Sequence, residues 1–272
     1  MPQARCDVAT LVLTLTGPMQ SWGTQEGGHL RGTDSAPSKS GVAGLIGSAL
    51  GRSRFESLSD IVDLPFAVRI DVPGTVVTDF HTMQRVNEYN GKTPLPEMCF
   101  GGRGYSRTTD AGATMHRRSY LVDAVFVVAL TGDAEFLTEI ASAVRRPVYP
   151  LFLGRRSCPA EPVDPHITEH DDPVDALKEY PFQGLAPVRR AYSNDEGVSV
   201  PKLRDGSWGV PDNLAVQREC SFGVVGSRER RDVPSVRSGW GRTFNTRAYE
   251  TVYITTPVEG DSPQTDDTPI GF

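Results

Sequence analysis

The 272-residue chain lacks any run of about 18 apolar residues, so its sequence predicts no membrane-spanning helix. Its first residues, MPQARCDVATLVLTLTG, lack the leucine-rich core and small-residue cleavage site of a signal peptide. Apolar residues make up only 38%, while 27 glycines and 21 prolines predict much ordered loop. This composition excludes collagen, a coiled coil and a wholly disordered chain. We therefore expect a cytoplasmic globular protein with no membrane contact.

Cysteine is also scarce. Cys6, Cys99, Cys158 and Cys220 are scattered and never form a CxxC pair, which argues against a disulfide framework and a structural zinc site. His166 and His170 have the i,i+4 spacing of metal ligands, but prolines crowd this segment and favour a surface loop. We expect neither a metal nor a cofactor.

Lysine is rare, since 24 of the 28 basic residues are arginine. The net charge of −6 argues against a nucleic-acid binder. The charge is uneven, however: residues 1–156 carry 16 basic and 15 acidic side chains, and residues 157–272 carry 12 and 19. A GC-rich genome can explain the arginines, and so can phosphate contact and stacking on bases. Only a local cationic patch would decide between these explanations.

Hydrophobic periodicity predicts an α+β fold with the order strand, helix, strand, strand, excursion, strand, helix, strand. The expected segments are 8–16, 38–51, 66–72, 75–80, 81–118, 120–130, 134–145 and 149–153, with a second short helix at 55–64. This order is the βαββαβ plan of ferredoxin-like (RRM-like) folds.

The chain then divides into a palm at 1–156, interrupted by the excursion at about 81–118, and a small, mostly-β portion at 157–256. Within the latter, 156–187 reads as a proline- and acid-rich loop, and short strands are expected at 191–193, 198–203, 220–225 and 249–255. Residues 257–272 are predicted to be a disordered acidic tail.

The segment SAPSKSG precedes an apolar helix but lacks the glycine before lysine that a P-loop needs. A helix start still offers free N–H groups, and Ser38, Lys39 and Ser40 add donors there. Phosphate or RNA backbone is one ligand for this site; ordinary capping is the equal alternative.

Single-stranded RNA is the ligand that the excursion favours, because it sets aromatic residues beside arginines and glycines. His81, His116 and Tyr120 could instead supply acid–base groups for metal-free RNA cleavage. After the expected strand 149–153, LFLGRRSCP places Arg155 and Arg156 at the rim of the sheet.

Five segments, read in order, carry a resemblance. They are GPMQSWG (17–23), SKSGVAGLIGSALG (38–51), DFHTMQ (79–84), RSYLVDAVFVVAL (118–130) and YPLFLGRRSCP (149–159). The chain resembles the type I-E CasD family, the fifth Cas family of CRISPR systems. The likeness is close over about residues 8–159, returns in RAYETVYI (247–254) and is loose between them.

The resemblance implies a ferredoxin-like palm with a β-hairpin thumb at 81–118, which together hold the 5′ handle of the guide RNA (crRNA). It implies docking on the backbone subunit CasC and the large subunit CasA, contact with CasB and CasE through the complex, and indirect contact with target DNA. The RNA-binding residues expected from chemistry and resemblance together are Arg155, Arg156, Lys39, Ser38, Ser40, Gln20, Ser21, Trp22, His81, Arg103, Arg107, His116, Arg117 and Arg118. Core packing is an equal alternative for Trp22.

Two functions remain in competition. In the first, the chain is a non-catalytic scaffold that caps the RNA, because in this family a separate endonuclease, CasE, processes the transcript. In the second, the chain is a metal-independent endoribonuclease, as type I-C relatives are. The I-E-like motifs favour the scaffold.

Overall fold

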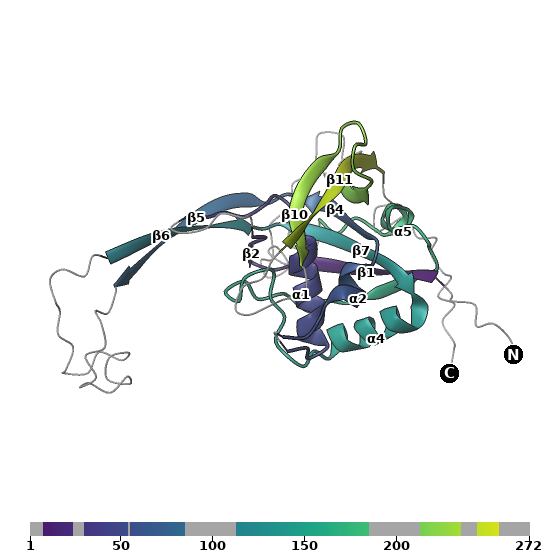
Figure 1. Ribbon diagram of the computed structural model, residues 1–272, viewed down its shortest axis with the longest axis horizontal. Helices are drawn as coiled ribbons and strands as arrows, with labels where there is room; N and C mark the ends of the chain where they lie inside the picture. Colours follow the sequence, from purple (N-terminus) through teal and green to yellow (C-terminus); the bar gives the residue numbers. More distant parts are fainter. Residues whose placement is uncertain are drawn as a thin grey trace, which may run out of the picture.

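The computed structural model describes residues 8–23, 30–53, 55–84, 113–184, 213–234 and 244–255, and within these ranges the fold is a mixed α/β arrangement of mostly antiparallel strands. A seven-stranded sheet has the order β10-β11-β9-β4-β7-β1-β8 (Figure 1). Its strands are β1 (Val8–Thr16), β4 (Phe66–Val72), β7 (Val125–Asp133), β8 (His166–Thr168), β9 (Leu214–Cys220), β10 (Arg228–Pro234) and β11 (Phe244–Ile254).

Helices cover both faces of this sheet. The helices are α1 (Lys39–Ala49), α2 (Ser59–Val62), α4 (Ala134–Arg145) and α5 (Pro173–Glu179). Alternate residues of β1 enter different cores: Leu11, Leu13 and Leu15 pack with α1 and α4, whereas Val12 packs with α5. Burial on both faces explains why β7 begins with six consecutive apolar residues and why β1 has apolar residues at neighbouring as well as alternate positions.

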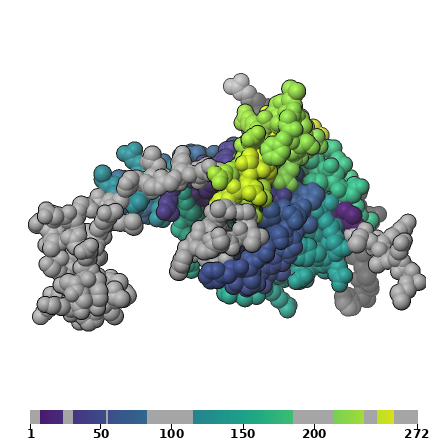
Figure 2. All heavy atoms as spheres, viewed as in Figure 1, coloured from purple at the N-terminus to yellow at the C-terminus, as the bar shows by residue number. Residues whose placement is uncertain are grey.

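A second, smaller sheet forms an arm that projects from the body (Figures 1 and 2). Strands β5 (Thr75–Gln84) and β6 (Ala113–Val122) form a long antiparallel hairpin. At its base, β2 (Met19–Gln20) and β3 (Leu30–Arg31) also pair with β6. We call β5 and β6 the hairpin arm.

The hairpin arm is longer than the predicted excursion at 81–118. Its first strand begins at Thr75 and its second strand ends at Val122. The single strand expected at 120–130 is wrong: it is divided between β6 and β7 at Asp123, whose φ is 57°. Residues 85–112, with Arg103 and Arg107, lie outside the described residues.

The predicted helices at 38–51 and 134–145 are confirmed as α1 and α4, and the short helix near 55–64 is the single turn α2. The strand expected at 149–153 is wrong. There the chain makes one isolated bridge, Phe152 with Pro159, and turns back at Gly154, whose φ is +83°. Strand β8 takes the edge position beside β1 instead. His166 therefore lies in a strand rather than a surface loop, and His170 pairs with Glu179 on α5.

The C-terminal strands extend the same sheet, because β9 pairs with both β4 and β11. Strand β11 includes most of the segment expected at 249–255 but begins five residues earlier, at Phe244. The strand expected at 220–225 is wrong, since β9 ends at Cys220 and a turn follows. Sequence analysis missed β8, β9, β10 and α5, and β8 and α5 interrupt the loop expected at 156–187. The strands expected at 191–193 and 198–203 and the tail at 257–272 lie outside the described residues.

A fully buried arginine fixes α5 to the sheet. Arg69 on β4 pairs with Asp71 and donates to the carbonyls of Leu177, Tyr180 and Pro181. These carbonyls lie at the end of α5 and just beyond it, where helix carbonyls lack partners. The buried charge is thus satisfied by an ion pair and by the chain that it holds in place.

Candidate nucleic-acid interface

Three of the sequence motifs meet around Trp22, which is fully buried. Its indole Nε1 donates to Gln20 Oε1 at 3.1 Å, and Gln20 Nε2 donates to the Ala124 carbonyl at 2.8 Å. A Cβ added at Gly41 of α1 would lie 2.8 Å from the indole ring. Ser21 N donates to the Leu153 carbonyl at 3.1 Å, which joins GPMQSWG to LFLGRRSCP.

This arrangement corrects the interpretation of Gln20, Ser21 and Trp22 as RNA contacts. All three are at most 1% exposed, and Ser21 Oγ donates to the Ser119 carbonyl. Their side-chain polar groups are used inside the protein. The packing alternative for Trp22 is therefore the one that the structure supports.

The N-terminus of α1 is occupied by the chain's own carboxylate. Ser38 caps the helix by accepting from Gly41 N, and Lys39 N donates to Asp232 Oδ2 at 2.9 Å. Lys39 Nζ lies 2.8 Å from both carboxylate oxygens of Glu219. An RNA phosphate at this helix start would have to displace Asp232 and Glu219, so the structure assigns Ser38 and Lys39 a structural role.

Asp232 belongs to a buried ionic cluster that joins α1 to the C-terminal strands. Arg247 on β11 pairs with Asp232 at 2.7 Å, and its guanidinium also lies over the Phe66 and Tyr249 rings. Asp232 and Arg247 are 4% and 7% exposed. We call Lys39, Glu219, Asp232 and Arg247 the ionic cluster. Sequence analysis missed it, because its members are far apart along the chain.

The two adjacent arginines of LFLGRRSCP have different surroundings. Arg155 donates to the carbonyls of Ser119, Arg31 and Gly32 at 2.9–3.2 Å. Its guanidinium carbon also lies 5.0 Å from the Tyr120 ring centre. Because Arg155 is committed to β6 and to the chain beside β3, it braces the hairpin arm rather than offering a free cation.

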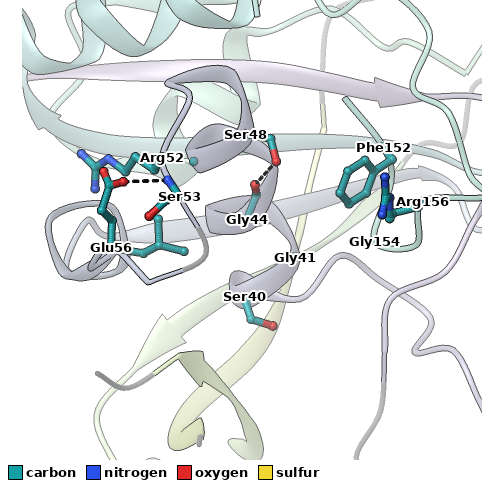
Figure 3. Close-up of a pocket in the computed structure, with 12 residues that line it drawn as sticks. Ser40, Gly41, Gly44, Ser48, Arg52, Ser53, Glu56, Phe152, Gly154 and Arg156 are labelled. Carbon is teal, nitrogen blue, oxygen red and sulfur yellow. Dashed lines mark hydrogen bonds between the residues drawn. The ribbon is translucent and has the colours of Figure 1, made fainter. Parts of the chain in front are cut away.

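Arg156, in contrast, is exposed and has no hydrogen-bond or ion-pair partner among the described residues. It points into a groove of about 400 Å³ along α1. Figure 3 shows Phe152 and Arg156 on one side of this helix and Arg52, Ser53 and Glu56 on the other. We call this hollow the α1 groove; it is lined by Ser40, Gly41, Gly44, Gly47, Ser48, Arg52, Ser53, Glu56, Leu58, Phe152, Gly154 and Arg156.

On the side of the α1 groove away from Arg156, the charged side chains have partners of their own. Arg52 forms a bidentate ion pair with Asp60, and this contact lowers the pKa of the Asp60 carboxyl. Glu56 accepts from Ser53 N at 2.8 Å, and hydrogen bonding from Ser53 lowers the pKa of the Glu56 carboxyl. Both carboxylates are therefore ionised at neutral pH, and Arg156 is the groove's uncompensated cation.

Two histidines come together on the hairpin arm. His81 and His116 are direct cross-strand partners, and His81 Nε2 lies 2.6 Å from Asp79 Oδ2. Arg118 is the partner of Asp79, so these four side chains share one face of the arm. Arg117 lies on the opposite face, opposite Phe80. The spacing along either strand alone did not reveal the pairing of the histidines.

Within the part of the chain that the structure describes, no group of three or more His, Cys, Asp or Glu is placed to hold a metal ion. The described helices are all too short or too polar to cross a membrane.

Comparison with known proteins now decides the family. A family model described as "CRISPR-associated protein (Cas_Cas5)" matches residues 10–231. The chain belongs to this Cas5 family. It is 35% identical over 212 residues to the CRISPR system Cascade subunit CasD of Escherichia coli strain K12, covering 71% of this chain and 84% of that protein.

Solved structures agree with the assignment to the Cas5 family. A chain of a CRISPR RNA-guided surveillance complex superposes with a TM-score of 0.64 at 28% identity, covering 91% of each chain. A structure described as that of a Cas protein gives a TM-score of 0.56 at 26% identity, covering 91% of this chain and 95% of that one. The likeness spans nearly the whole length of each molecule.

Proposed function

We propose that this Cas5-family chain is a non-catalytic RNA-binding subunit of a type I-E Cascade surveillance complex that holds the 5′ handle of the crRNA. The observation that carries the proposal is Arg156, an exposed guanidinium without a partner among the described residues. It follows directly on Arg155, which ties the segment after Leu153 to the hairpin arm. Guanidinium groups suit phosphate oxygens because they donate two parallel hydrogen bonds.

The palm, in this proposal, is ferredoxin-like. Strands β4, β7, β1 and β8 are consecutive neighbours in the sheet, and α1 and α4 are its crossover helices. The hairpin arm leaves this unit between β4 and β7, which is where a thumb would be inserted. This arrangement supports a palm and thumb that grip RNA between them.

The hairpin arm carries an apolar surface for a protein neighbour. Val76, Phe80 and Met115 share one face of the arm and are 61%, 53% and 58% exposed. Exposed apolar side chains in such a cluster are typical of a protein contact. We assign this face to the backbone subunit CasC. The large subunit CasA would lie nearby, and CasB, CasE and target DNA would be reached through the complex.

Binding of single-stranded handle RNA tests the proposal. We expect Arg156→Ala to weaken binding several-fold and to reduce the slope of log affinity against log salt by about 0.7. The matched control is Arg228→Ala, which removes an exposed arginine of β10 that does not line the groove. Failure of the unmodified protein to bind the RNA, or an equal effect of the two variants, would contradict the proposal.

The pairing of His81 with His116 favours one second candidate, a metal-independent endoribonuclease. One imidazole would take the proton of a 2′-hydroxyl, whose oxygen attacks the adjacent phosphorus; the other would protonate the departing 5′ oxygen. The products are a 2′,3′-cyclic phosphate and a 5′-hydroxyl.

Incubation of the purified protein with repeat RNA in EDTA separates the two functions. Cleavage at one site, lost in both His81→Ala and His116→Ala, would establish the enzyme. Intact RNA that stays bound is the result expected for the scaffold.

A further inference from the structure

The α1 groove has the size of a small-ligand site rather than of a channel for a strand. Its volume of about 400 Å³ lies at the lower end of the range for small-molecule pockets. One wall comes from the segment with Phe152 and Arg156 and the other from the loop with Arg52 and Glu56, with α1 between them (Figure 3). A ligand in this groove is therefore compact and lies against the helix.

The floor of the groove is open because of one glycine. A Cβ added at Gly44 would meet no atom within 4 Å, whereas one at Gly41 would meet Trp22 and one at Gly47 would meet Leu58, each at 2.8 Å. The buried Trp22 ring thus requires glycine at position 41, whereas at position 47 only the terminal methyl of Leu58 would have to move, and at position 44 nothing opposes a side chain. Glycine in a helix interior costs about 1 kcal/mol relative to alanine. Stability therefore does not explain why position 44 is a glycine.

The two sides of the groove carry charges of opposite sign. Arg156 supplies a cation on one side, while on the other Arg52 is neutralised by Asp60 and Glu56 retains its negative charge. Phe152, beside Arg156 in the lining, offers an aromatic ring. A matching ligand has an anion at one end, a flat ring, and an amino group that can donate to a carboxylate at the other.

We propose that the α1 groove holds one unstacked nucleotide of the RNA, with its phosphate on Arg156, its base against Phe152 and the helix, and an amino group of the base toward Glu56. The inference rests on the proposed function and adds to it a site for a single nucleotide. Carboxylates accept from the exocyclic amine of cytosine, and single-stranded bases stack on aromatic side chains. The arrangement favours an amino-bearing base over uracil.

The lining offers one cation for a phosphate, because Arg52 is paired with Asp60 and Arg156 is not paired among the described residues. The α1 amides inside the helix are already hydrogen bonded, and the helix start is occupied by Asp232. The neighbouring nucleotides must therefore be held outside the groove, for example on the hairpin arm.

Substitution of Gly44 tests the groove without removing any contact of the protein. We expect Gly44→Leu, which fills the floor, to lower the affinity for a single-stranded RNA of about ten nucleotides by roughly tenfold. Gly44→Ala, which meets no atom within 4 Å, should reduce affinity less and should fold at least as stably. The thermal unfolding midpoint of each variant identifies a folding defect.

Crosslinking locates the nucleotide. RNA substituted with 5-iodocytidine, a photoreactive base that keeps the amino group of cytosine, is bound to the full-length chain, irradiated and digested for mass spectrometry. We expect crosslinks on the peptide that contains Phe152, weakened by Gly44→Leu. A Glu56→Gln variant should lose the preference for cytosine over uridine that the unmodified protein shows.

The outcomes separate the two proposals. RNA affinity that is unchanged in folded Gly44→Leu, with crosslinks confined to the hairpin arm, overturns the groove and leaves the proposed function standing. If Gly44→Leu leaves RNA affinity unchanged but weakens assembly of the complex, the nucleotide site is overturned and the groove instead holds a segment of a partner protein. No RNA binding by the unmodified chain overturns both proposals.

Discussion

The guanidinium of Arg155 lies over the ring of Tyr120, with 5.0 Å from its central carbon to the ring centre, and it donates at the same time to three backbone carbonyls. Tyr120 lies at the base of β6, where the hairpin arm joins the palm. This one side chain therefore links the segment after Leu153 to the arm.

Replacing Arg155 should destabilise the fold. We expect Arg155→Ala to lower the free energy of unfolding by about 2 kcal/mol, because a stacking contact and several charged hydrogen bonds are lost. Arg156→Ala, the adjacent exposed position, should change it by less than about 0.5 kcal/mol. Urea denaturation of both variants measures the difference; equal stabilities would contradict a bracing role.

The ionic cluster should contribute strongly to stability. We expect Asp232→Ala to cost about 3 kcal/mol, since Arg247 stays buried without its closest partner and Lys39 N loses its acceptor. Asp164→Ala is the control, because Asp164 is 92% exposed in its ion pair with Arg145 and should contribute under about 1 kcal/mol. Comparable losses in the two variants would show that the cluster is not a buried anchor.

Two glycines of α1 should respond oppositely to the same substitution. Gly44→Ala should raise the free energy of unfolding by up to about 1 kcal/mol, because no atom opposes the new methyl group. Gly41→Ala should lower it, since its methyl group would lie 2.8 Å from the buried Trp22 ring. Thermal unfolding of the two variants checks the signs, and a stabilising Gly41→Ala would contradict the packing described here.

Cys158 should resist alkylation. Burial raises the pKa of its thiol, with weaker opposing effects from Ser157 and Arg155. The thiolate is the reactive form, so iodoacetamide at about pH 8.5 should modify Cys158 far more slowly in the folded chain than in urea. Because the pKa is higher in the folded state, this thiol's contribution to stability is full at low pH and falls as pH rises through its titration range. Rapid native labelling, read by peptide mass spectrometry, would contradict this.

Local signals in the sequence predicted the elements that depend on them. Each of these signals lies within a few neighbouring residues. They are Ser38 as the cap of α1, the turn at Gly51 with φ of +74°, and the apolar stripe of α4. The order of strands and helices in the palm followed from these elements. The hairpin arm was expected, but its bounds were not, because the apolar end of β6 (120–122) is separated from the apolar β7 only by Asp123 and Ala124.

Chemistry at the candidate site was harder to predict, because residue type does not reveal what a side chain already contacts. Lys39 and Arg155 have the right charge for RNA, yet Glu219 and three carbonyls take up their donors. The partners are remote in sequence: Glu219 lies 180 residues from Lys39. Arg156 was predicted together with Arg155, and only the three-dimensional structure distinguishes the two.

Both strands of the arm cross from one sheet to the other at neighbouring points. Val72 is opposite Val125 in the large sheet, and Thr75 is opposite Val122 in the small one. Pro73-Gly74 and Asp123-Ala124 span the two crossings, and Gly74 is packed against Val122 and Ala124. The hairpin arm is thus attached to the large sheet by two short connections that pack against each other. A hairpin of another length or surface can therefore be joined at these few residues without changing the strand pairing of the large sheet.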